Sequence, residues 1–212
     1  SKVSGPKDVF VDGQNGYNGA DLILLQNNTA TIIEITSSGV PINKQLSGDW
    51  SQIEKSIDWI LFKTQDGSKG KMQQIIDAVN KLKSGKLAGG GKAGDEIKDI
   101  FPVIVFEEGI SQVRPIISII REKAEKAGLD AEQAARLELW DAEELEASDS
   151  AFVFGIAAAI AKKHASEYRD FPWKNFLKWA GLASKSSFVD VAFNAATSDL
   201  SSLLFKGVMP LK

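Results

Sequence analysis

The chain has 212 residues and a formal net charge of −3. It contains no cysteine, which excludes disulfides, thiolate zinc sites and a cysteine nucleophile, and its single histidine, His164, excludes a site with two histidines. A metal bound by this chain would therefore need oxygen ligands, which favours Mg²⁺ or Mn²⁺. The acidic balance argues against an extended basic surface, although it leaves room for a local basic groove.

The hydrophobic pattern predicts five strands, three of which precede any helix. Their ranges are 8–12, 20–26, 29–36, 101–106 and 136–140. The second and third strands are nearly continuous apolar runs, which is typical of strands covered on both faces. Apolar residues at helical spacing predict helices over 49–63, 71–82, 112–127, 151–166, 173–180 and 188–204, with another beginning at 141. This order predicts an α/β (α+β) fold in which helices flank a mixed central sheet.

The first predicted helix illustrates the local signals. Trp50, Ile53 and Ile57 fall on one stripe, which predicts that this face packs on the sheet. Ser47 or Asp49 is a suitable cap for its N-terminus. Between the second helix and the fourth strand, the glycine-rich segment 85–94 predicts a loop, because its spacing does not fit that of a phosphate-binding loop.

The most informative segment is the hairpin formed by the second and third predicted strands. Asn27 and Asn28 predict a two-residue turn, since asparagine tolerates the positive φ that tight hairpins need. Counting outward from this turn places Asp21 directly opposite Glu34, on one face and about 5 Å apart. Two carboxylates so close are unfavourable unless a proton or a cation lies between them. The alternative is that Asp21 binds a turn amide and Glu34 merely lies at the rim of the sheet.

The order of elements and these two acids resemble the PD-(D/E)XK nuclease superfamily, whose fold is that of many restriction enzymes. Asp21, in Gly-Ala-Asp, stands where the family has its first acid, and Glu34 stands where the family has the acid of its Glu-x-Lys element. The resemblance covers roughly residues 8–145. It implies a restriction-endonuclease-like core over 1–148, followed by a helical C-terminal extension or subdomain over 149–212.

The resemblance also implies an activity. A metal-dependent endonuclease, a hydrolase of phosphodiester bonds in DNA or RNA, would hold Mg²⁺ or Mn²⁺ with Asp21, Glu34 and the carbonyl of Ile35. Position 36 faces the same side of the strand as Glu34, and the family has a lysine there to orient the attacking water. This chain has Thr36 instead.

A lysine from elsewhere in the chain could replace the missing charge. In cap-snatching endonucleases of some segmented negative-strand RNA viruses, which share this fold, Glu-x-Thr occurs and the lysine comes from the following helix. Lys55 is the corresponding candidate here, and Lys44, in the loop after the third strand, is the other. Each is otherwise an ordinary solvated lysine.

Three interpretations of the whole chain stay open at this point. The first is the nuclease, with nucleic acid as its partner. The second is a catalytically inactive nuclease-fold module that binds nucleic acid or a protein, as Thr36 suggests. The third is a delivered toxin domain of a larger system. We expect a cytoplasmic location with no membrane association, because the longest apolar run, 151–161, is too short to cross a bilayer.

One C-terminal segment, 168–179, interleaves aromatic and basic residues. Such a pattern can stack bases while binding phosphates. It can equally dock an amphipathic helix on the core through its aromatic residues.

Overall fold

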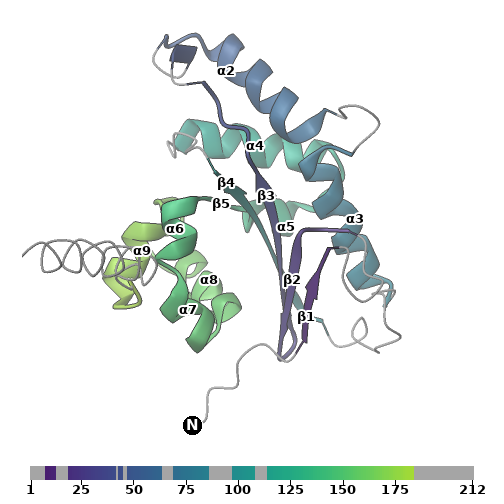
Figure 1. Cartoon of the computed structure of the whole chain (residues 1–212), viewed down its shortest axis with the longest axis vertical. Coiled ribbons are helices and arrows are strands. Elements are labelled where there is room, and N and C mark those ends of the chain that lie inside the picture. The colour runs from purple at the N-terminus through teal and green to yellow at the C-terminus, as the bar shows by residue number, and fades with distance from the viewer. Residues whose placement is uncertain are drawn as a thin grey trace, which may run out of the picture.

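The computed structural model describes residues 8–12, 19–41, 43–44, 47–63, 69–85, 97–107 and 114–183. Five strands form one sheet, whose spatial order follows the order of the chain (Figure 1). They are β1 (Asp8–Val11), β2 (Leu22–Gln26), β3 (Thr29–Thr36), β4 (Asp99–Phe106) and β5 (Glu138–Asp141). The first three strands are antiparallel, and β3, β4 and β5 are parallel. The mixed central sheet predicted from the sequence is therefore confirmed.

The hairpin has the predicted register. Gln26 pairs with Thr29 and Leu22 with Ile33, so the turn consists of Asn27 and Asn28. Asn27 has a φ of 54°, the left-handed conformation that the asparagine pair predicted. The turn thereby sets which side chains share each face of the hairpin.

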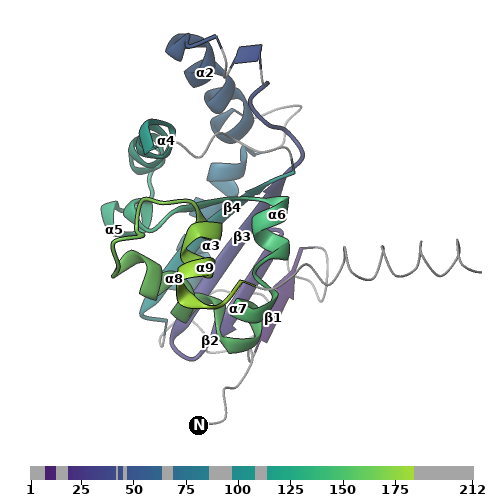
Figure 2. The ribbon, with the colours of Figure 1, turned by 90° about the vertical axis from the view of Figure 1, so that its left-hand side faces the viewer.

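Helices cover both faces of the sheet, in two separate groups (Figures 1 and 2). The first group comprises α2 (Trp50–Ile57), its continuation η1 (Asp58–Phe62), α3 (Lys71–Lys83), α4 (Arg114–Lys126) and α5 (Ala131–Ala135). The second group comprises α6 (Ala142–Glu146), α7 (Asp149–Phe154), α8 (Ile156–His164) and α9 (Trp173–Ala180). The chain after 149, predicted as a helical extension or subdomain, thus contributes helices to the second face of the sheet.

Each face of the sheet has its own apolar core. Ile23 and Ile32 pack with the first group of helices, whereas Leu24 and Ile33 pack with the second group. This alternation is the two-residue period of a strand with both faces buried, as the continuous apolar runs predicted. Asp21 lies two residues from Ile23 and Glu34 lies two residues from Ile32, so both acids point to the same face of the sheet as these isoleucines. This is the face that α3 covers.

The helix predicted over 49–63 begins as expected and ends differently. Asp49 caps it by accepting hydrogen bonds from the amides of Ser51 and Gln52. Its last turn, Asp58–Phe62, is a π-helix, a wider turn that often occurs near functional sites. The prediction that Trp50 lies on the buried stripe is wrong, because its side chain is 48% exposed beside the helix start.

The helix predicted over 151–166 is two helices. Gly155 separates α7 from α8, and its φ of 114° is accessible to glycine but strained for other residues. A Cβ at this position would also lie 2.9 Å from the side chain of Gln26 on the edge of the hairpin. The sharp bend therefore lets α8 lie against the sheet. The helix predicted over 188–204 lies outside the described residues, as does most of the loop predicted over 85–94.

The aromatic segment 168–179 docks a helix on the core. Trp173 and Phe176 of α9 are fully buried, and the ring of Trp173 stacks on Trp140 of β5 with 4.9 Å between centroids. Its indole nitrogen donates a hydrogen bond of 2.7 Å to the buried hydroxyl of Ser148. These two buried rings are thus not available to stack bases, whereas Phe171 and Trp179 of the same segment are 39% and 48% exposed. In the part of the chain that the structure describes, none of the helices combines the length and apolar character needed to span a membrane.

Candidate functional site

The two acids of the hairpin lie together where β2 begins and β3 ends. The carboxylate of Glu34 accepts a hydrogen bond of 3.1 Å from the amide of Asp21. In return, the carboxylate of Asp21 accepts one of 2.7 Å from the amide of Ile35. Each acidic side chain is therefore held in place by a backbone amide of the opposite strand. The sequence-based pairing of Asp21 with Glu34 is therefore present in the folded protein.

A lysine occupies the position between the two carboxylates. Nζ of Lys71 lies 2.9 Å from Oε2 of Glu34 and 3.3 Å from Oδ2 of Asp21. Glu34 is completely buried, whereas Asp21 and Lys71 retain 33% and 26% of their side-chain exposure. The cation that two neighbouring carboxylates require is thus supplied by the protein itself, at a point that solvent can reach.

Burial and charge act in opposite directions on this cluster. Burial raises the pKa of Glu34 to about 8, although the hydrogen bond and charge of Lys71 lower it. Burial also lowers the pKa of Lys71, but its bonds to Glu34 and Asp21 outweigh this effect and raise it above its ordinary value. One ammonium group shared by two acids is not enough to ionise the buried acid fully. At neutral pH, Glu34 therefore holds a proton that a second cation could displace.

The start of α3 explains how Lys71 reaches the acids. Lys71 is the first residue of this helix, where the helix dipole disfavours a positive charge. Gly70 precedes it, and a Cβ at Gly70 would lie 2.9 Å from the carbonyl oxygen of Leu61 and about as close to the next two residues of the backbone. Glycine thus lets the start of α3 pack directly against the end of η1. The sequence offers one signal for Lys71, a Gly-Lys pair at the start of a predicted helix. Lys71 was not among the residues predicted for the site.

The other two residues of the predicted motif also lie at this site. Thr36 is buried, and its hydroxyl accepts a hydrogen bond of 3.2 Å from the amide of Ser38. Ile35 points its side chain to the opposite face and is 45% exposed. Both residues line a cavity of about 270 Å³ together with Lys71, Gly70 and Lys63. Thr36 therefore faces the space beside the acids without carrying charge there.

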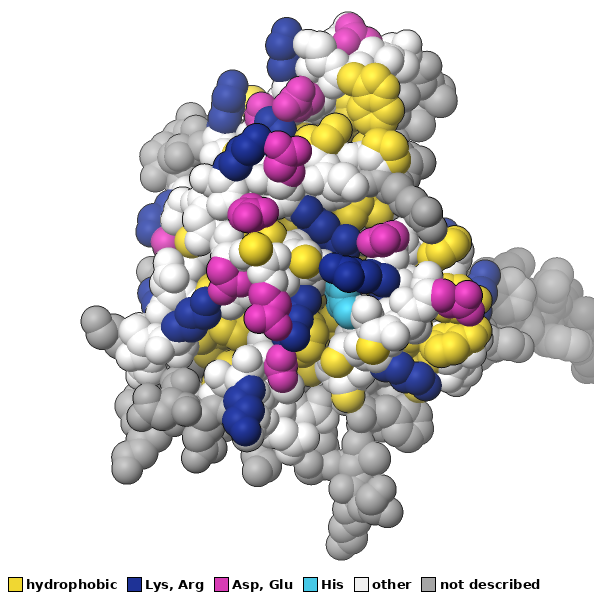
Figure 3. All heavy atoms as spheres, turned by 180° about the vertical axis from the view of Figure 1, so that it is seen from behind, with side chains coloured by type: hydrophobic (Ala, Val, Ile, Leu, Met, Phe, Trp, Pro, Cys, Tyr) yellow, Lys and Arg dark blue, Asp and Glu magenta, His cyan; other side chains and the backbone are white. Residues whose placement is uncertain are grey.

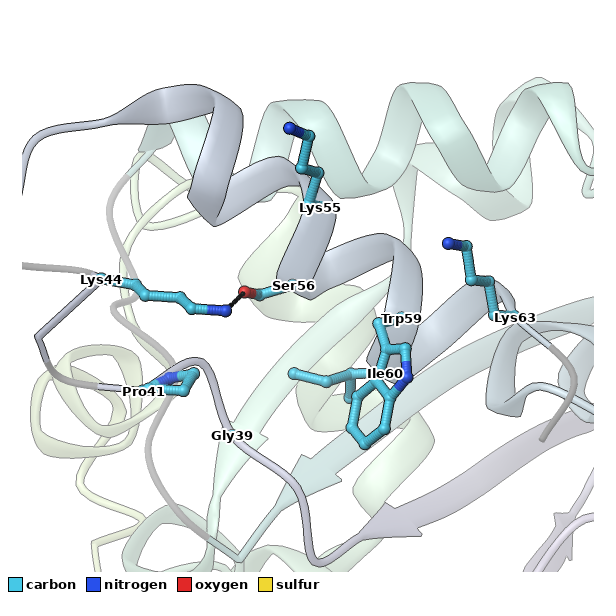
Figure 4. Close-up of a pocket in the computed structure, with 8 residues that line it drawn as sticks. All are labelled: Gly39, Pro41, Lys44, Lys55, Ser56, Trp59, Ile60 and Lys63. Carbon is cyan, nitrogen blue, oxygen red and sulfur yellow. Dashed lines mark hydrogen bonds between the residues drawn. The ribbon is translucent and has the colours of Figure 1, made fainter. Parts of the chain in front are cut away.

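The two lysines proposed from the sequence lie elsewhere. Lys44 donates a hydrogen bond of 3.2 Å to the hydroxyl of Ser56 on α2. Lys44 and Lys55 both line a separate pocket between the loop after β3 and α2 (Figure 4). The structure brings neither of them to Asp21 and Glu34. The lysine at the acids comes from α3, whereas α2 was the helix expected to supply it.

Further polar residues surround the acids on the solvent side. A cavity of about 500 Å³ is lined by Asp21 and Lys71 together with Asp12, Gly19, Lys69, Gln74, Asp77 and Lys81. Asp12 accepts a hydrogen bond of 3.0 Å from the amide of Gly19. Lys69 forms an ion pair with Asp77. The acids thus open onto a polar, lysine-containing surface.

The site offers oxygen ligands that suit a hard divalent ion, but only a few of them. Asp21 and Glu34 provide two carboxylates, and Mg²⁺ is often bound by one or two carboxylates with waters and substrate phosphates completing its shell. Among the described residues, no group of three or more Asp, Glu or His side chains is placed to hold a metal. A bound ion would therefore depend on these two acids, on main-chain oxygen and on its substrate.

A second charged cluster lies on the opposite face of the sheet. Glu138 of β5 is buried, with Nζ of Lys163 at 2.8 Å and Nε2 of His164 at 2.9 Å from its Oε1. Burial raises the pKa of Glu138, but the charges of Lys163 and His164 outweigh it and lower the pKa below its ordinary value. Lys163 also donates to the carbonyl of Arg169. Figure 3 shows this side of the molecule, where positive and negative side chains intermingle around the histidine.

Comparisons of this chain with protein-family models, with curated proteins and with solved structures found no match.

Proposed function

We propose that this protein is a metal-dependent nuclease that hydrolyses phosphodiester bonds in DNA or RNA. The observation that carries the proposal is the contact of Lys71 with both Asp21 and Glu34 at a solvent-accessible point where β2 begins and β3 ends. The arrangement supplies the charge that Thr36 lacks, and it resembles the acid and lysine constellation of PD-(D/E)XK nucleases. Such an enzyme would act in the cytoplasm, or be delivered there as a toxin domain.

Asp21 and Glu34 are the residues that would hold Mg²⁺ or Mn²⁺. When bound, such an ion polarises the phosphate and lowers the pKa of a water. Glu34 must first release its proton, since burial raises its pKa to about 8. We therefore expect metal affinity to increase as the pH rises towards 8.

Lys71 has two roles in this proposal. Without metal, its ammonium group neutralises the acids and keeps them close. With metal and substrate, the same group is within reach of a phosphate oxygen and offsets its negative charge, which strengthens in the transition state. The hydroxyl of Thr36 accepts a hydrogen bond from Ser38, so it cannot replace this charge.

The same contacts favour a second candidate, an inactive nuclease-fold module that binds nucleic acid or a protein partner. Lys71 already satisfies both acids, and the proton on Glu34 removes the need for another cation. A protein that had exchanged its metal for an internal ammonium group would have this arrangement. The two candidates differ in whether a divalent ion enters the cluster.

The decisive experiment measures cleavage of labelled single- and double-stranded DNA and RNA with Mg²⁺ or Mn²⁺ at pH 8. We expect Glu34→Gln and Asp21→Asn to abolish cleavage and Lys71→Met to slow it at least about 100-fold. Lys178→Met, an exposed change on α9, is the matched control and should cleave normally. Activity that survives both acid substitutions would overturn the assignment.

Calorimetric titration with Mn²⁺ separates the nuclease from the inactive module. The nuclease is expected to bind Mn²⁺ at millimolar concentration or better, with proton release, and to lose this binding in Glu34→Gln. A folded wild-type protein that neither binds Mn²⁺ nor cleaves any substrate would support the inactive module instead.

A further inference from the structure

The segment that ends in α9 carries an aromatic patch formed by Tyr168, Phe171 and Trp179. Tyr168 joins the other two, because the ring of Trp179 stacks on it with 5.1 Å between centroids and the ring of Phe171 lies 5.6 Å from it. Phe171 and Trp179 are 39% and 48% exposed, whereas Trp173 and Phe176 of α9 are buried. The segment thus presents apolar surface on a second side, away from the core that its buried rings fill.

Contacts with its neighbours hold the ring of Trp179 in one position. Besides stacking on Tyr168, the ring lies 5.8 Å from the buried ring of Phe176, and Nζ of Lys162 lies 5.4 Å from its centroid. A ring that is already fixed loses little side-chain entropy when another apolar group packs on its exposed part. Trp179 is therefore a suitable anchor for an apolar partner.

The chain turns back beside this patch at the end of the described residues. Gly181 ends α9 with a φ of 68°, a left-handed conformation that suits glycine. The amides of Leu182 and Ala183 both donate to the carbonyl of Leu177, at 2.9 Å and 3.1 Å. Leu177 and Trp179 belong to the same last turn of α9, so the chain that follows Ala183 starts close to the aromatic patch.

The sequence after this point contains an amphipathic pattern over 188–204. Its apolar residues recur at helical spacing and fall on one stripe, namely Phe188, Ala192, Ala196, Leu200 and Leu203. Polar residues fall on the other side, namely Asn194, Thr197, Ser198 and Ser201. Such a helix depends on an apolar surface that covers its stripe. The sequence therefore predicts a helix that needs a partner, a short distance along the chain from the patch.

Two observations favour this segment over a second copy of the chain as the partner of the patch. Only 184–187 separates the described residues from 188–204, and a short connection keeps two surfaces of one chain at a high effective concentration. The charged residues of 188–204 are Asp190 and Asp199, both acidic, whereas the charge that contacts Trp179 is that of Lys162. The segment thus matches the patch in position, in apolar character and in charge.

We propose that the segment 188–204 packs on the aromatic patch as an amphipathic helix, with Trp179 as the anchor of the contact. The interaction surface on α9 is thus a docking site for a segment of the same chain. In Figure 2, α9 lies on the face of the sheet opposite to α3. The contact is therefore separate from Asp21 and Glu34, and it does not depend on whether the protein cleaves nucleic acid.

The test measures the reactivity of a single introduced thiol, since the chain contains no cysteine of its own. Ala196→Cys places a small apolar thiol on the stripe, and Ser198→Cys places one on the polar side of the same predicted helix. Each full-length variant reacts with DTNB, and the rate is divided by its rate in urea. We expect Ala196→Cys to react at least about 10-fold more slowly than Ser198→Cys, because only accessible thiols react readily.

Two further changes test the two sides of the contact. Trp179→Ala removes the anchor, and Leu203→Asp puts a charge on the stripe. In the Ala196→Cys background, either change should bring the rate to within about 2-fold of that of Ser198→Cys, because the contact depends on a few buried groups. The matched controls are Trp50→Ala, which removes a tryptophan of equal exposure at the start of α2, and Ser201→Asp on the polar side. Both controls should leave the slow rate unchanged.

Circular dichroism shows whether each variant is folded, and the rates are measured at several protein concentrations. Slow reaction of Ala196→Cys that is independent of concentration and is released by Trp179→Ala supports the inference. Equal rates of Ala196→Cys and Ser198→Cys in folded proteins overturn it. Protection that persists in Trp179→Ala also overturns it, because the segment then packs elsewhere. Protection that grows with protein concentration assigns the patch to a second copy of the chain and overturns the contact within one chain.

Discussion

The two faces of the sheet each bury a glutamate beside a lysine, yet the two clusters are in opposite electrostatic states. On the α3 face, two acids, Glu34 and Asp21, share the single ammonium group of Lys71. On the α8 face, the single acid Glu138 has two basic partners, Lys163 and His164. Burial opposes ionisation in both, but the pKa of Glu34 is raised and that of Glu138 is lowered.

The ratio of charges, more than burial, explains the difference. Glu138 is buried against the ammonium group of Lys163, which is also buried, and this is the arrangement of a structural ion pair. Glu34 shares a single ammonium group with the partly exposed Asp21, which is the reason that a second cation is proposed for this cluster. The comparison supports the proposal that the first cluster is the functional site and the second is part of the scaffold. Substitutions in either cluster test it.

The largest effect is expected from removing the lysine of the scaffold cluster. Lys163→Met leaves Glu138 with only His164 and should lower the free energy of unfolding by about 3–5 kcal/mol. Urea denaturation measures this, with the exposed Lys178→Met expected within about 0.5 kcal/mol of the wild type. A Lys163→Met protein as stable as the control would mean that Glu138 is not held as an ion.

The next effect is a pH dependence carried by Glu34. Its folded pKa of about 8 exceeds its ordinary value of 4.5, so the folded protein binds this proton more tightly than the unfolded chain does. The stability it contributes is complete below pH 4.5 and is lost as the pH rises to about 8, by a total of the order of a few kcal/mol. Glu34→Gln should remove this decline when denaturation is measured from pH 5 to 8. An unchanged pH profile would contradict the raised pKa.

The stability that Glu138 contributes should depend on pH in the opposite direction. Its folded pKa is lowered, so its contribution is present above pH 4.5 and is lost as the pH falls below that value. Acid denaturation of Glu138→Gln should accordingly depend less on pH than that of the wild type. The same steepness in both proteins would show that the two clusters do not differ as proposed.

A smaller effect is expected at the start of α3. Gly70→Ala places a methyl group against the backbone of η1 and should cost about 1–3 kcal/mol, while shifting Lys71 from the acids. Thermal unfolding measures the cost, and Mn²⁺ titration measures the change at the acids. If the variant matched the wild type in both stability and Mn²⁺ affinity, the close packing of Gly70 against the backbone of η1 would be unimportant.

The smallest effect is expected at the ion pair between the exposed Lys69 and the partly exposed Asp77. Lys69→Ala should change the free energy of unfolding by less than about 1 kcal/mol, because Lys69 is well exposed and Asp77 keeps contact with solvent. Urea denaturation in low and high salt checks this value. A loss comparable with that of Lys163→Met would contradict the distinction between surface and scaffold charges.

Local signals account for most of what could be predicted. The asparagine turn and the two-residue period of the strands place Asp21 opposite Glu34, because both are properties of a short contiguous segment. Asp49 caps its helix as expected, and Asp141 caps α6 in the same way, by bonds to amides two or three residues away. Gly155, in contrast, breaks a helix because it must pass close to Gln26, a contact that no local pattern reveals.

The sequence by itself determined the mixed sheet and the paired acids, since both follow from periodicity and from one tight turn. It did not determine which cation the acids would meet. Lys71 lies 37 residues beyond Glu34, and it reaches the carboxylates only because α3 packs on the sheet with Gly70 at its start. Lys44 and Lys55, nearer in sequence, are directed instead to the pocket beside Trp59. Only the packing of α2, η1 and α3 decided that arrangement, because the position of a long side chain depends on how its helix lies against the rest of the protein.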